Sequence, residues 1–297
     1  MKLLIIGLDG LDYDIVLRWG LKQYLQKYHG KHYVGFACKL YTPILWSMFL
    51  TGINVEKHGY SLEELKRKRK QDIWKHNFLK KLYSHRKRVP IKKLGIRYLL
   101  IKLGLVKPYP PSILPKHLLE RTFIVELKHK GLKVSAIEIP GFNEERNEKY
   151  RTLHEKYVTK NLREKLSFLN EIIDDCRERI QQALNFIVKG YDLVFVYLPL
   201  PDIAHHLLYR NLREIVELRK IYGSLWKMIS PLISHAENYA ILLVSDHGFE
   251  IKNQYHSKWG FWSLNIKPPF IPSKITDFKK LVLEITHSLQ EPLRELM

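Results

Sequence analysis

The fold class of this chain is decided by one stretch, Tyr239-Ala-Ile-Leu-Leu-Val-Ser-Asp246-His247-Gly248-Phe249. It is an apolar run of strand type that stops on a serine and then delivers a carboxylate, an imidazole and a glycine. Its lack of polar and apolar alternation is typical of a strand buried on both faces of a parallel sheet. Open α/β sheets bind their ligands at the carboxyl ends of such strands. The stretch therefore predicts an α/β fold with chemistry at Asp246 and His247.

Two further apolar runs have the same form and also end beside acidic residues. Residues 1–9 form a short run that ends on Asp9, and residues 191–200 lead directly into Pro201 and Asp202. Because the carboxyl ends of parallel strands meet at one edge of a sheet, we expect Asp9, Asp202 and Asp246 to lie close together.

The segments between these strands predict helices on both faces of a mostly parallel sheet. Thr42 before Pro43 indicates a short helix with a threonine cap and a proline in its first turn. The expected helices cover residues 13–28, 43–50, 122–130, 161–188, 211–229 and the C-terminal segment. Two further strands are expected at residues 33–38 and 133–139. A loop is expected from residue 249 to about residue 272. We expect a single α/β domain over residues 1–297, with a basic, mainly helical insertion or cap over residues 62–115.

The composition is that of a globular protein, with 45% hydrophobic and 27% charged residues. The sequence contains no run of about 18 apolar residues, so no transmembrane helix is expected. The N-terminal apolar run is too short for the core of a signal peptide. We therefore expect a cytoplasmic protein. Cys38 and Cys176 are the only cysteines, which excludes a disulfide framework and a cysteine-based zinc site. Any metal must be held by carboxylates and imidazoles.

The net charge of +20 is concentrated in one segment, because residues 66–107 contain 16 Lys or Arg and one acid, Asp72. This segment can be a solvated helical surface, or it can attract an anionic partner. An apolar stripe at helical spacing could pack in a core, close over the active site or lie on an anionic membrane surface, which would make the protein peripheral at the membrane. The stripe consists of Ile91, Leu94, Tyr98, Ile101 and Leu105. Nucleic acid is disfavoured as a partner because no nucleic-acid-binding motif accompanies the charge.

A set of polar residues collects at or just past the expected strand ends. Three Asp, three His and one hydroxyl suit two divalent cations that have mixed nitrogen and oxygen ligands. Such a pair of cations can clamp the entering and leaving oxygens of a phosphoryl displacement. His205 is left out, since it and its neighbour His206 cannot point the same way. The set is Asp9, Thr42, Asp202, His206, Asp246, His247 and His256.

The order and spacing of these motifs resemble the alkaline phosphatase superfamily, and within it the type I phosphodiesterase/nucleotide pyrophosphatase branch. The resemblance covers roughly residues 1–60 and 130–265. The nucleophile of these enzymes lies nine residues before the threonine of a Thr-Gly pair, which selects Thr42. The matching motifs are Gly7-Leu-Asp9-Gly10, Thr42-Pro through Thr51-Gly52, Lys57-His58-Gly59, Asp202 with His206, Ser245-Asp246-His247-Gly248, and His256.

The resemblance implies two divalent metal ions, with zinc favoured and manganese or iron possible, and a phosphorylated small molecule or another anionic substrate. It implies that Thr42, deprotonated by its metal, attacks phosphorus and forms a phosphothreonine, which water then hydrolyses. By the same resemblance, one metal is held by Asp202, His206 and His256, and the second by Asp9, Asp246, His247 and the Thr42 oxygen.

One departure from the family pattern concerns phosphate binding. In the diesterase relatives the backbone N–H after the nucleophile can help to bind a phosphate oxygen, but Pro43 has no N–H. Asn54, Lys57 or a basic side chain of the insertion could serve instead. The departure weakens a strict nucleotide pyrophosphatase assignment more than it weakens hydrolysis. The alternatives are a phosphomonoesterase or phosphomutase of the same superfamily, and a non-catalytic binder of anionic lipid or nucleic acid.

Overall fold

The computed structural model describes residues 1–72, 103, 109, 111–251 and 255–287, and its main feature is a six-stranded sheet. The strand order is β2-β8-β5-β1-β4-β3, and β6 pairs with β7 in a separate hairpin. β8 runs antiparallel to both of its neighbours, whereas β1 pairs in parallel with β4 and β5, and β3 with β4. The bounds are β1 Lys2–Leu8, β2 Tyr28–Tyr33, β3 Val134–Ile137, β4 Leu193–Leu198, β5 Tyr239–Val244, β6 Gly248–Glu250, β7 Tyr255–Ser257 and β8 Trp259–Leu264. The fold is therefore α/β with a mostly parallel sheet, as predicted.

The central strand β1 shows why its sequence lacks alternation: both of its faces are buried. Leu4 and Ile6 pack in the core that contains α9 and α11, while Leu3 and Ile5 pack in the core that contains α2 and α12. Removing apolar surface of this kind from water stabilises the fold by roughly 25 cal/mol per Å². A polar residue has no favourable position in such a strand before its last residue. The chemistry-bearing acids are therefore confined to the strand ends.

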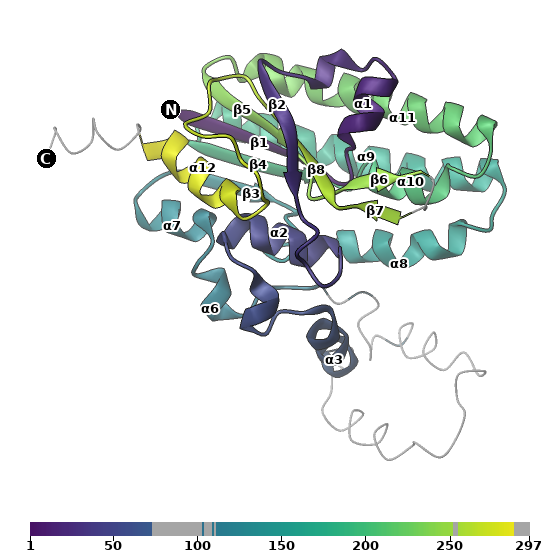
Figure 1. Cartoon of the computed structure of the whole chain (residues 1–297), viewed down its shortest axis with the longest axis horizontal. Coiled ribbons are helices and arrows are strands. Elements are labelled where there is room, and N and C mark those ends of the chain that lie inside the picture. The colour runs from purple at the N-terminus through teal and green to yellow at the C-terminus, as the bar shows by residue number, and fades with distance from the viewer. Residues whose placement is uncertain (73–102, 104–108, 110, 252–254, 288–297) are drawn as a thin grey trace, which may run out of the picture.

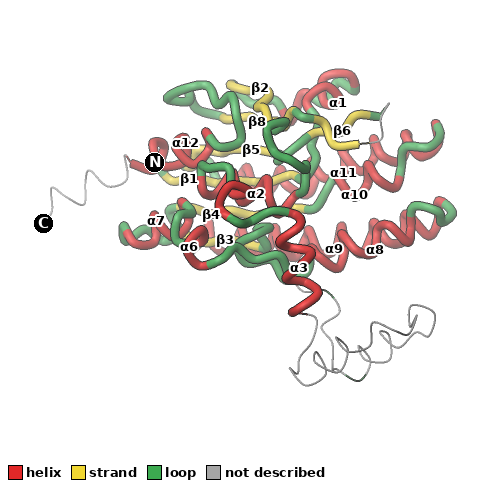
Figure 2. Tube along the Cα trace, turned by 60° about the horizontal axis from the view of Figure 1, so that its bottom comes forward, coloured by secondary structure: helices red, strands yellow, loops and turns green. Residues whose placement is uncertain are grey.

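Helices cover both faces of the sheet, as expected. Figures 1 and 2 show α2, α7 and α12 grouped together, and α9 beside α11. The helical bounds are α1 Tyr13–Arg18, η1 Lys22–Tyr24, α2 Thr42–Thr51, η2 Val55–His58, α3 Leu62–Asp72, α6 Lys116–Leu119, α7 Phe123–His129, α8 Asn147–Tyr157, α9 Leu162–Val188, α10 Asp202–Leu207, α11 Leu212–His235 and α12 Asp277–His287.

The prediction for residues 13–38 was wrong in its boundaries. The helix expected to reach residue 28 ends at Arg18. Gly20 follows with a φ of +67°, a backbone conformation that residues with a side chain disfavour. The second strand covers Tyr28–Tyr33 instead of 33–38. Its sequence is polar because it lies at the edge of the sheet, where it pairs with β8 alone among the described strands. An apolar run is therefore a poor guide to this strand.

The expected loop from 249 to about 272 contains three strands, β6, β7 and β8, and α8 was not predicted at all. Two of these strands have three residues each, which is too short for a periodic pattern to be recognised. The strand β8 inserts antiparallel between β2 and β5, so the sheet edge is built by residues far apart in sequence.

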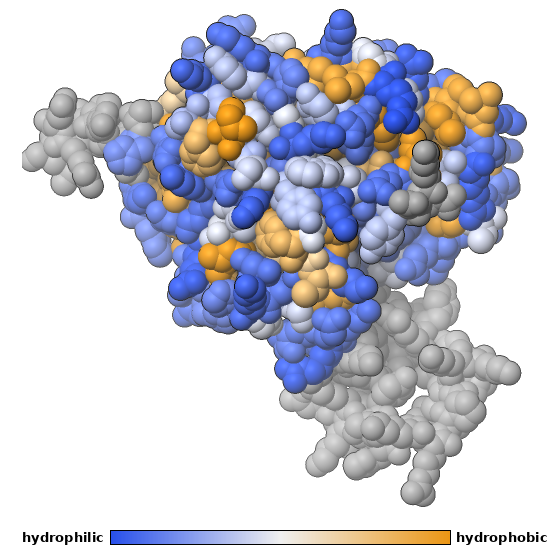
Figure 3. Space-filling view, viewed as in Figure 1, coloured by the Kyte–Doolittle hydropathy of each residue, from blue (hydrophilic) through white to orange (hydrophobic). Residues whose placement is uncertain are grey.

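Of the predicted basic insertion, the structure describes α3 and residues 103, 109 and 111–115. The rest, including all five residues of the apolar stripe, lies outside the described residues. Figure 1 shows α3 lying away from the sheet. Among the helices that the structure describes, none has the length and apolar character needed to cross a bilayer. On the face shown in Figure 3, hydrophobic residues form several separate groups on a mainly hydrophilic surface.

Candidate metal centre

The predicted ligands converge at the carboxyl ends of three neighbouring strands. Asp9 follows β1, Asp202 begins α10 after β4, and Asp246 follows β5. The backbone of Asp202 donates to the carbonyl of Asp9 at 2.9 Å, which joins two of these ends directly. Gly10 has a φ of +69°, and a Cβ there would lie 2.8 Å from the Asp202 Cβ. A glycine is therefore required for the two acids to approach one another.

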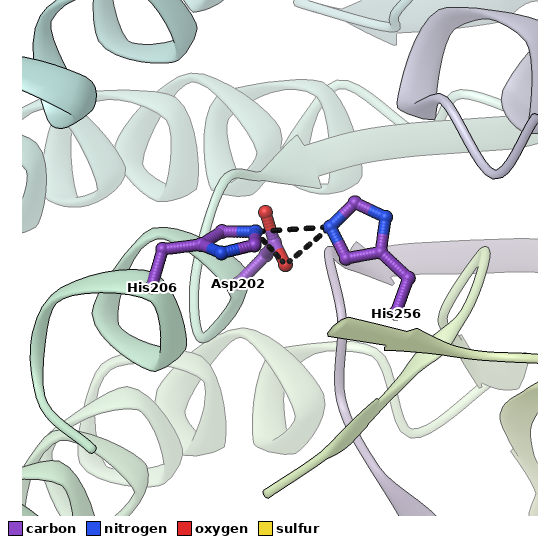
Figure 4. A group of neighbouring side chains, drawn as sticks. All are labelled: Asp202, His206 and His256. Carbon is purple, nitrogen blue, oxygen red and sulfur yellow. Dashed lines mark hydrogen bonds and ion pairs between the residues drawn. The ribbon is translucent and has the colours of Figure 1, made fainter. Parts of the chain in front are cut away.

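The first ligand group consists of Asp202, His206 and His256, which point toward one another from α10 and β7 (Figure 4). The Asp202 Oδ1 lies 3.4 Å from the His206 Nε2 and 3.5 Å from the His256 Nε2. The two Nε2 atoms lie 2.9 Å apart. Because His206 is four residues after Asp202, both side chains leave the same face of α10. His205 points elsewhere, with its Nε2 2.8 Å from the Tyr222 hydroxyl.

The second ligand group consists of Asp9, Asp202 and His247, so Asp202 belongs to both groups. The His247 Nε2 lies 3.4 Å from the Asp9 Oδ1 and 3.5 Å from the Asp246 Oδ2. Asp246 therefore lies next to this group. Its other oxygen, Oδ1, accepts a hydrogen bond from the Gly10 N–H at 3.4 Å. The imidazoles of the two groups touch, since the His247 ring stacks on His256 with ring centroids 3.8 Å apart.

Backbone carbonyls fix which nitrogen each imidazole presents to the centre. The Nδ1 of His247 lies 3.0 Å from the Gly248 carbonyl, and the Nδ1 of His256 lies 2.9 Å from the Leu40 carbonyl. Since a carbonyl can only accept, both Nδ1 atoms carry the proton, and both Nε2 lone pairs face the ligand groups. This arrangement is typical of histidines that bind metal ions.

Several buried ligand atoms have no hydrogen-bond partner among the described residues. Leaving such atoms unsatisfied in a protein interior costs roughly 1–3 kcal/mol each, and more if they are charged. They are Asp9 Oδ1, Asp202 Oδ1, Asp246 Oδ2 and His247 Nε2. All belong to the two ligand groups or adjoin them, so divalent cations would satisfy all of them together. The carboxylate and imidazole donors suit zinc, manganese or iron.

Burial acts to raise the pKa values of all three acids, and their different neighbours then shift these values apart. Burial raises the pKa of Asp246 well above its ordinary value, and the neighbouring Asp9 raises it further. Burial and the charge of Asp202 likewise raise the pKa of Asp9. Burial alone would raise the pKa of Asp202, but His206 and His256 hold it well below its ordinary value. Asp202 therefore favours its ionised form, while Asp9 and Asp246 lose their protons less readily than ordinary carboxyl groups.

Thr42 is the first residue of α2, and it is buried, with 4% of its surface exposed. The prediction that it caps this helix is wrong: the capping position belongs to Tyr41, and the Thr42 hydroxyl makes no hydrogen bond to another described residue. Pro43 does lie in the first turn, as predicted. The hydroxyl therefore has no structural partner in the described part of the chain.

A cavity of about 350 Å³ connects Thr42 with the ligands. Its lining includes Asp9, Thr42, Asp202, His206 and His256. Asp246 and His247 are completely buried and lie behind this wall. A larger groove of about 590 Å³ runs between α2 and α12, far from these residues in the fold, and its described lining contains no metal-ligand group. The smaller cavity is therefore the candidate site.

Helix α8 forms one wall of this cavity and contributes residues that the sequence did not single out. They are Asn147, Glu148, Arg151, Thr152, His154 and Glu155. By contrast, neither proposed phosphate donor near Thr42 lines the cavity: Asn54 caps η2 by accepting the Glu56 N–H at 3.1 Å, and Lys57 lies within η2.

The start of α8 is fixed to the end of β3 by Glu138. The backbone of Glu138 has a φ of +57°, a conformation that residues other than glycine rarely adopt. Its carboxylate accepts the N–H groups of Glu145 and Arg146 at 3.0 and 3.1 Å, and its carbonyl accepts the Asn147 Nδ2 at 2.7 Å. The amide of Asn147 is thereby oriented, and its Oδ1 has no partner among the described residues.

Tyr197 lies within the buried, apolar strand β4, and its hydroxyl donates to the Asp9 Oδ2 through a short hydrogen bond. This bond leaves the other oxygen of Asp9, Oδ1, directed at His247. We therefore expect Tyr197→Phe to weaken zinc binding by roughly 10- to 100-fold, because such outer contacts orient the ligand.

The measurement for Tyr197→Phe is competition against a zinc-chelating dye. The matched control is Tyr239→Phe, since the Tyr239 hydroxyl donates to the Tyr191 carbonyl at 2.6 Å at the opposite end of β5. Equal zinc affinities in the two variants would show that Tyr197 does not orient Asp9.

A family model and two solved structures are similar to this chain. A sequence model of the family described as type I phosphodiesterase/nucleotide pyrophosphatase matches residues 3–262. A search of curated proteins gave no match. Two similar solved structures are both of murine ectonucleotide pyrophosphatase/phosphodiesterase 5, the second being an inactive variant in complex with AMP. Each is 13% identical and covers 84% of this chain, with TM-scores of 0.43 and 0.41.

This chain corresponds to 57% of the length of the murine chain. The family match, in contrast, extends from β1 to β8 and includes every predicted ligand and Thr42. The chain therefore belongs to the type I phosphodiesterase/nucleotide pyrophosphatase family.

Proposed function

We propose that the protein is a metal-dependent hydrolase that cleaves a phosphodiester or pyrophosphate bond, with Thr42 as its nucleophile. The observation that carries the proposal is the Thr42 hydroxyl, which lines the same cavity as Asp9 and Asp202 and has no hydrogen-bond partner among the described residues. A buried hydroxyl that caps nothing is available for chemistry. The family assignment supports the same reaction class.

The residues of the two ligand groups would hold the metal ions. One would take Asp202, His206 and His256, and the other Asp9 and His247, with Asp246 adjoining. When bound, such ions lower the pKa of a coordinated hydroxyl and neutralise charge on a phosphoryl group.

The helix that Thr42 begins supports a role for this residue in phosphoryl transfer. The N-terminus of α2 carries a partial positive charge, which favours an anion in front of Thr42. The Thr42 oxygen would form a bond to phosphorus as the ester or pyrophosphate oxygen departs with a proton. Water would then cleave the phosphothreonine and restore the hydroxyl.

Two alternative functions use the same residues differently. A phosphomonoesterase or phosphomutase would share the centre and differ in substrate or acceptor. A non-catalytic binder of anionic lipid or nucleic acid is disfavoured, because a vestigial centre would be expected to have lost ligands, and all the predicted ligands are present.

The test of the proposed function is hydrolysis of bis(p-nitrophenyl) phosphate, p-nitrophenyl phosphate and a nucleoside diphosphate by the full chain, with added zinc, manganese or magnesium. We expect turnover that chelation abolishes. Metal-loaded protein that hydrolyses none of these, while binding anionic vesicles or DNA, would contradict the proposal and favour the binder.

Zinc affinity is expected to increase as pH rises from about 5.5 to about 8, because binding displaces protons. The pKa values of Asp9 and Asp246 are raised in the metal-free protein, so these acids keep their protons to higher pH than ordinary carboxyl groups. Burial opposes a high pKa for His206, but Asp202 holds it above its ordinary value. All three groups must lose protons to coordinate zinc. Calorimetry in buffers of different ionisation enthalpy measures how many protons are released on zinc binding. A zinc affinity that does not change with pH would contradict this prediction.

A further inference from the structure

We propose that Arg151 of α8 binds a non-bridging phosphate oxygen of the substrate, and that it favours substrates whose phosphate carries two negative charges over simple diesters. Such substrates are a phosphate monoester or the terminal phosphate of a pyrophosphate. The inference rests on the proposed function: within it, the contact favours pyrophosphates over diesters, and it also favours the monoester substrates of the phosphomonoesterase alternative.

Two carboxylates hold the guanidinium of Arg151 in one orientation. Its Nη2 lies near the carboxylates of Glu144 and Glu148, and its Nε lies 3.3 Å from the Glu148 Oε2. The Arg151 side chain is 13% exposed, and those of Glu144 and Glu148 are 0% and 5% exposed. A guanidinium is planar, so fixing one edge also fixes the direction of the other edge.

The other edge of this guanidinium is unused. The Nη1 of Arg151 is buried and has no hydrogen-bond partner among the described residues, although it carries two N–H donors. Arg151 lines the cavity together with Thr42, and no other Lys or Arg does so among the described residues. A buried guanidinium nitrogen without a partner, on a residue that lines the cavity, favours an oxygen anion as its acceptor.

The residues that follow Thr42 in the first turn of α2 supply no free N–H donor for a phosphate oxygen. Pro43 has no N–H, and the N–H groups of Ile44 and Leu45 both donate to the carbonyl of Tyr41, at 2.8 and 3.1 Å. Apart from the Thr42 N–H, the non-bridging oxygens of a phosphoryl group at Thr42 therefore need donors from elsewhere. Helix α8 provides one across the cavity.

The charge of Arg151 decides which phosphates benefit from this contact. Burial alone would lower its pKa, but Glu144, Tyr41 and Glu148 hold it well above the ordinary value, so the group is a cation at all working pH values. A hydrogen bond from a cation strengthens with the negative charge of the acceptor. A dianionic phosphate gains more from the contact than the monoanion of a diester.

The experiment compares Arg151→Gln with Arg146→Gln in the metal-loaded full chain. Arg146 is a matched control, since it also pairs with several acids, Glu138, Asp175 and Glu178, but does not line the cavity. We expect Arg151→Gln to lower kcat/KM for p-nitrophenyl phosphate by roughly 10- to 100-fold, as for loss of one charge-assisted hydrogen bond. The loss for bis(p-nitrophenyl) phosphate should be several-fold smaller, and Arg146→Gln should affect both substrates equally.

Binding of inorganic phosphate, measured by calorimetry on the same proteins, keeps the test independent of turnover. We expect Arg151→Gln to weaken phosphate binding by about 10-fold or more with zinc content unchanged. Equal losses on the two esters, or phosphate binding like that of Arg146→Gln, would overturn the inference while leaving the hydrolase intact. Wild-type protein without turnover on either ester would instead count against the proposed function.

Discussion

Replacing Thr42 with alanine is expected to remove turnover, by about 1000-fold or more, while the protein keeps its metal ions. The Thr42 hydroxyl makes no hydrogen bond to a described residue, so its loss leaves no structural group unsatisfied. The carboxylate and imidazole ligands of the two groups are untouched by the change. The measurements are kcat with bis(p-nitrophenyl) phosphate and zinc content by mass spectrometry.

The matched control for this variant is Thr51→Ala, at the other end of the same helix. Thr51 is equally buried, and its hydroxyl donates to the Ser47 carbonyl at 2.7 Å, away from the cavity. We expect Thr51→Ala to lower stability slightly and to leave kcat near the wild-type value. A Thr42→Ala protein with wild-type kcat would exclude the phosphothreonine.

Replacing Asp246 with asparagine is expected to have opposite effects on the metal-free and metal-loaded protein. Without metal, the buried Asp246 carboxyl has a pKa raised well above its ordinary value, so ionising it near neutral pH costs folding free energy. Stability that depends on its proton is present at low pH and is lost as pH rises through the raised pKa. The asparagine variant avoids this loss, so we expect the metal-free Tm near pH 8 to rise.

With zinc present, the same Asp246→Asn change should remove most of the zinc-induced rise in Tm and lower kcat by at least about 100-fold, because an anionic group beside His247 is lost. Asp277→Asn serves as control, since Asp277 accepts the Ser273 and Lys274 N–H groups at the start of α12, away from the cavity. If zinc raised the Tm of Asp246→Asn as much as that of the wild type, Asp246 would not contribute to the centre.

The sheet and the ligand acids could be predicted because one physical rule governs both. A strand buried on both faces excludes polar residues until its end, so Asp9, Asp202 and Asp246 each stand out after an apolar run. Parallel neighbours then place those ends at one edge of the sheet. His206 follows from its helical offset, four residues after Asp202.

The wall of the cavity formed by α8 could not be predicted in the same way. Arg151 and Asn147 lie in a charged stretch in which only Tyr150, Leu153 and Tyr157 are strongly apolar, so neither a core face nor a site is evident. Their roles depend on contacts with residues of other segments, such as that of Asn147 with Glu138 after β3, and a helical pattern within 147–157 cannot reveal such contacts. Tyr197 was hidden for the opposite reason: inside a buried strand, its ring suits the core and conceals the hydroxyl that contacts Asp9.

The most direct test of the account is the number of divalent metal ions bound per chain, measured by mass spectrometry on full-length protein after zinc loading and removal of free metal. We expect close to two ions per wild-type chain. Fewer than one ion per chain, in protein that is folded by circular dichroism, would contradict the metal centre and the hydrolytic function built on it.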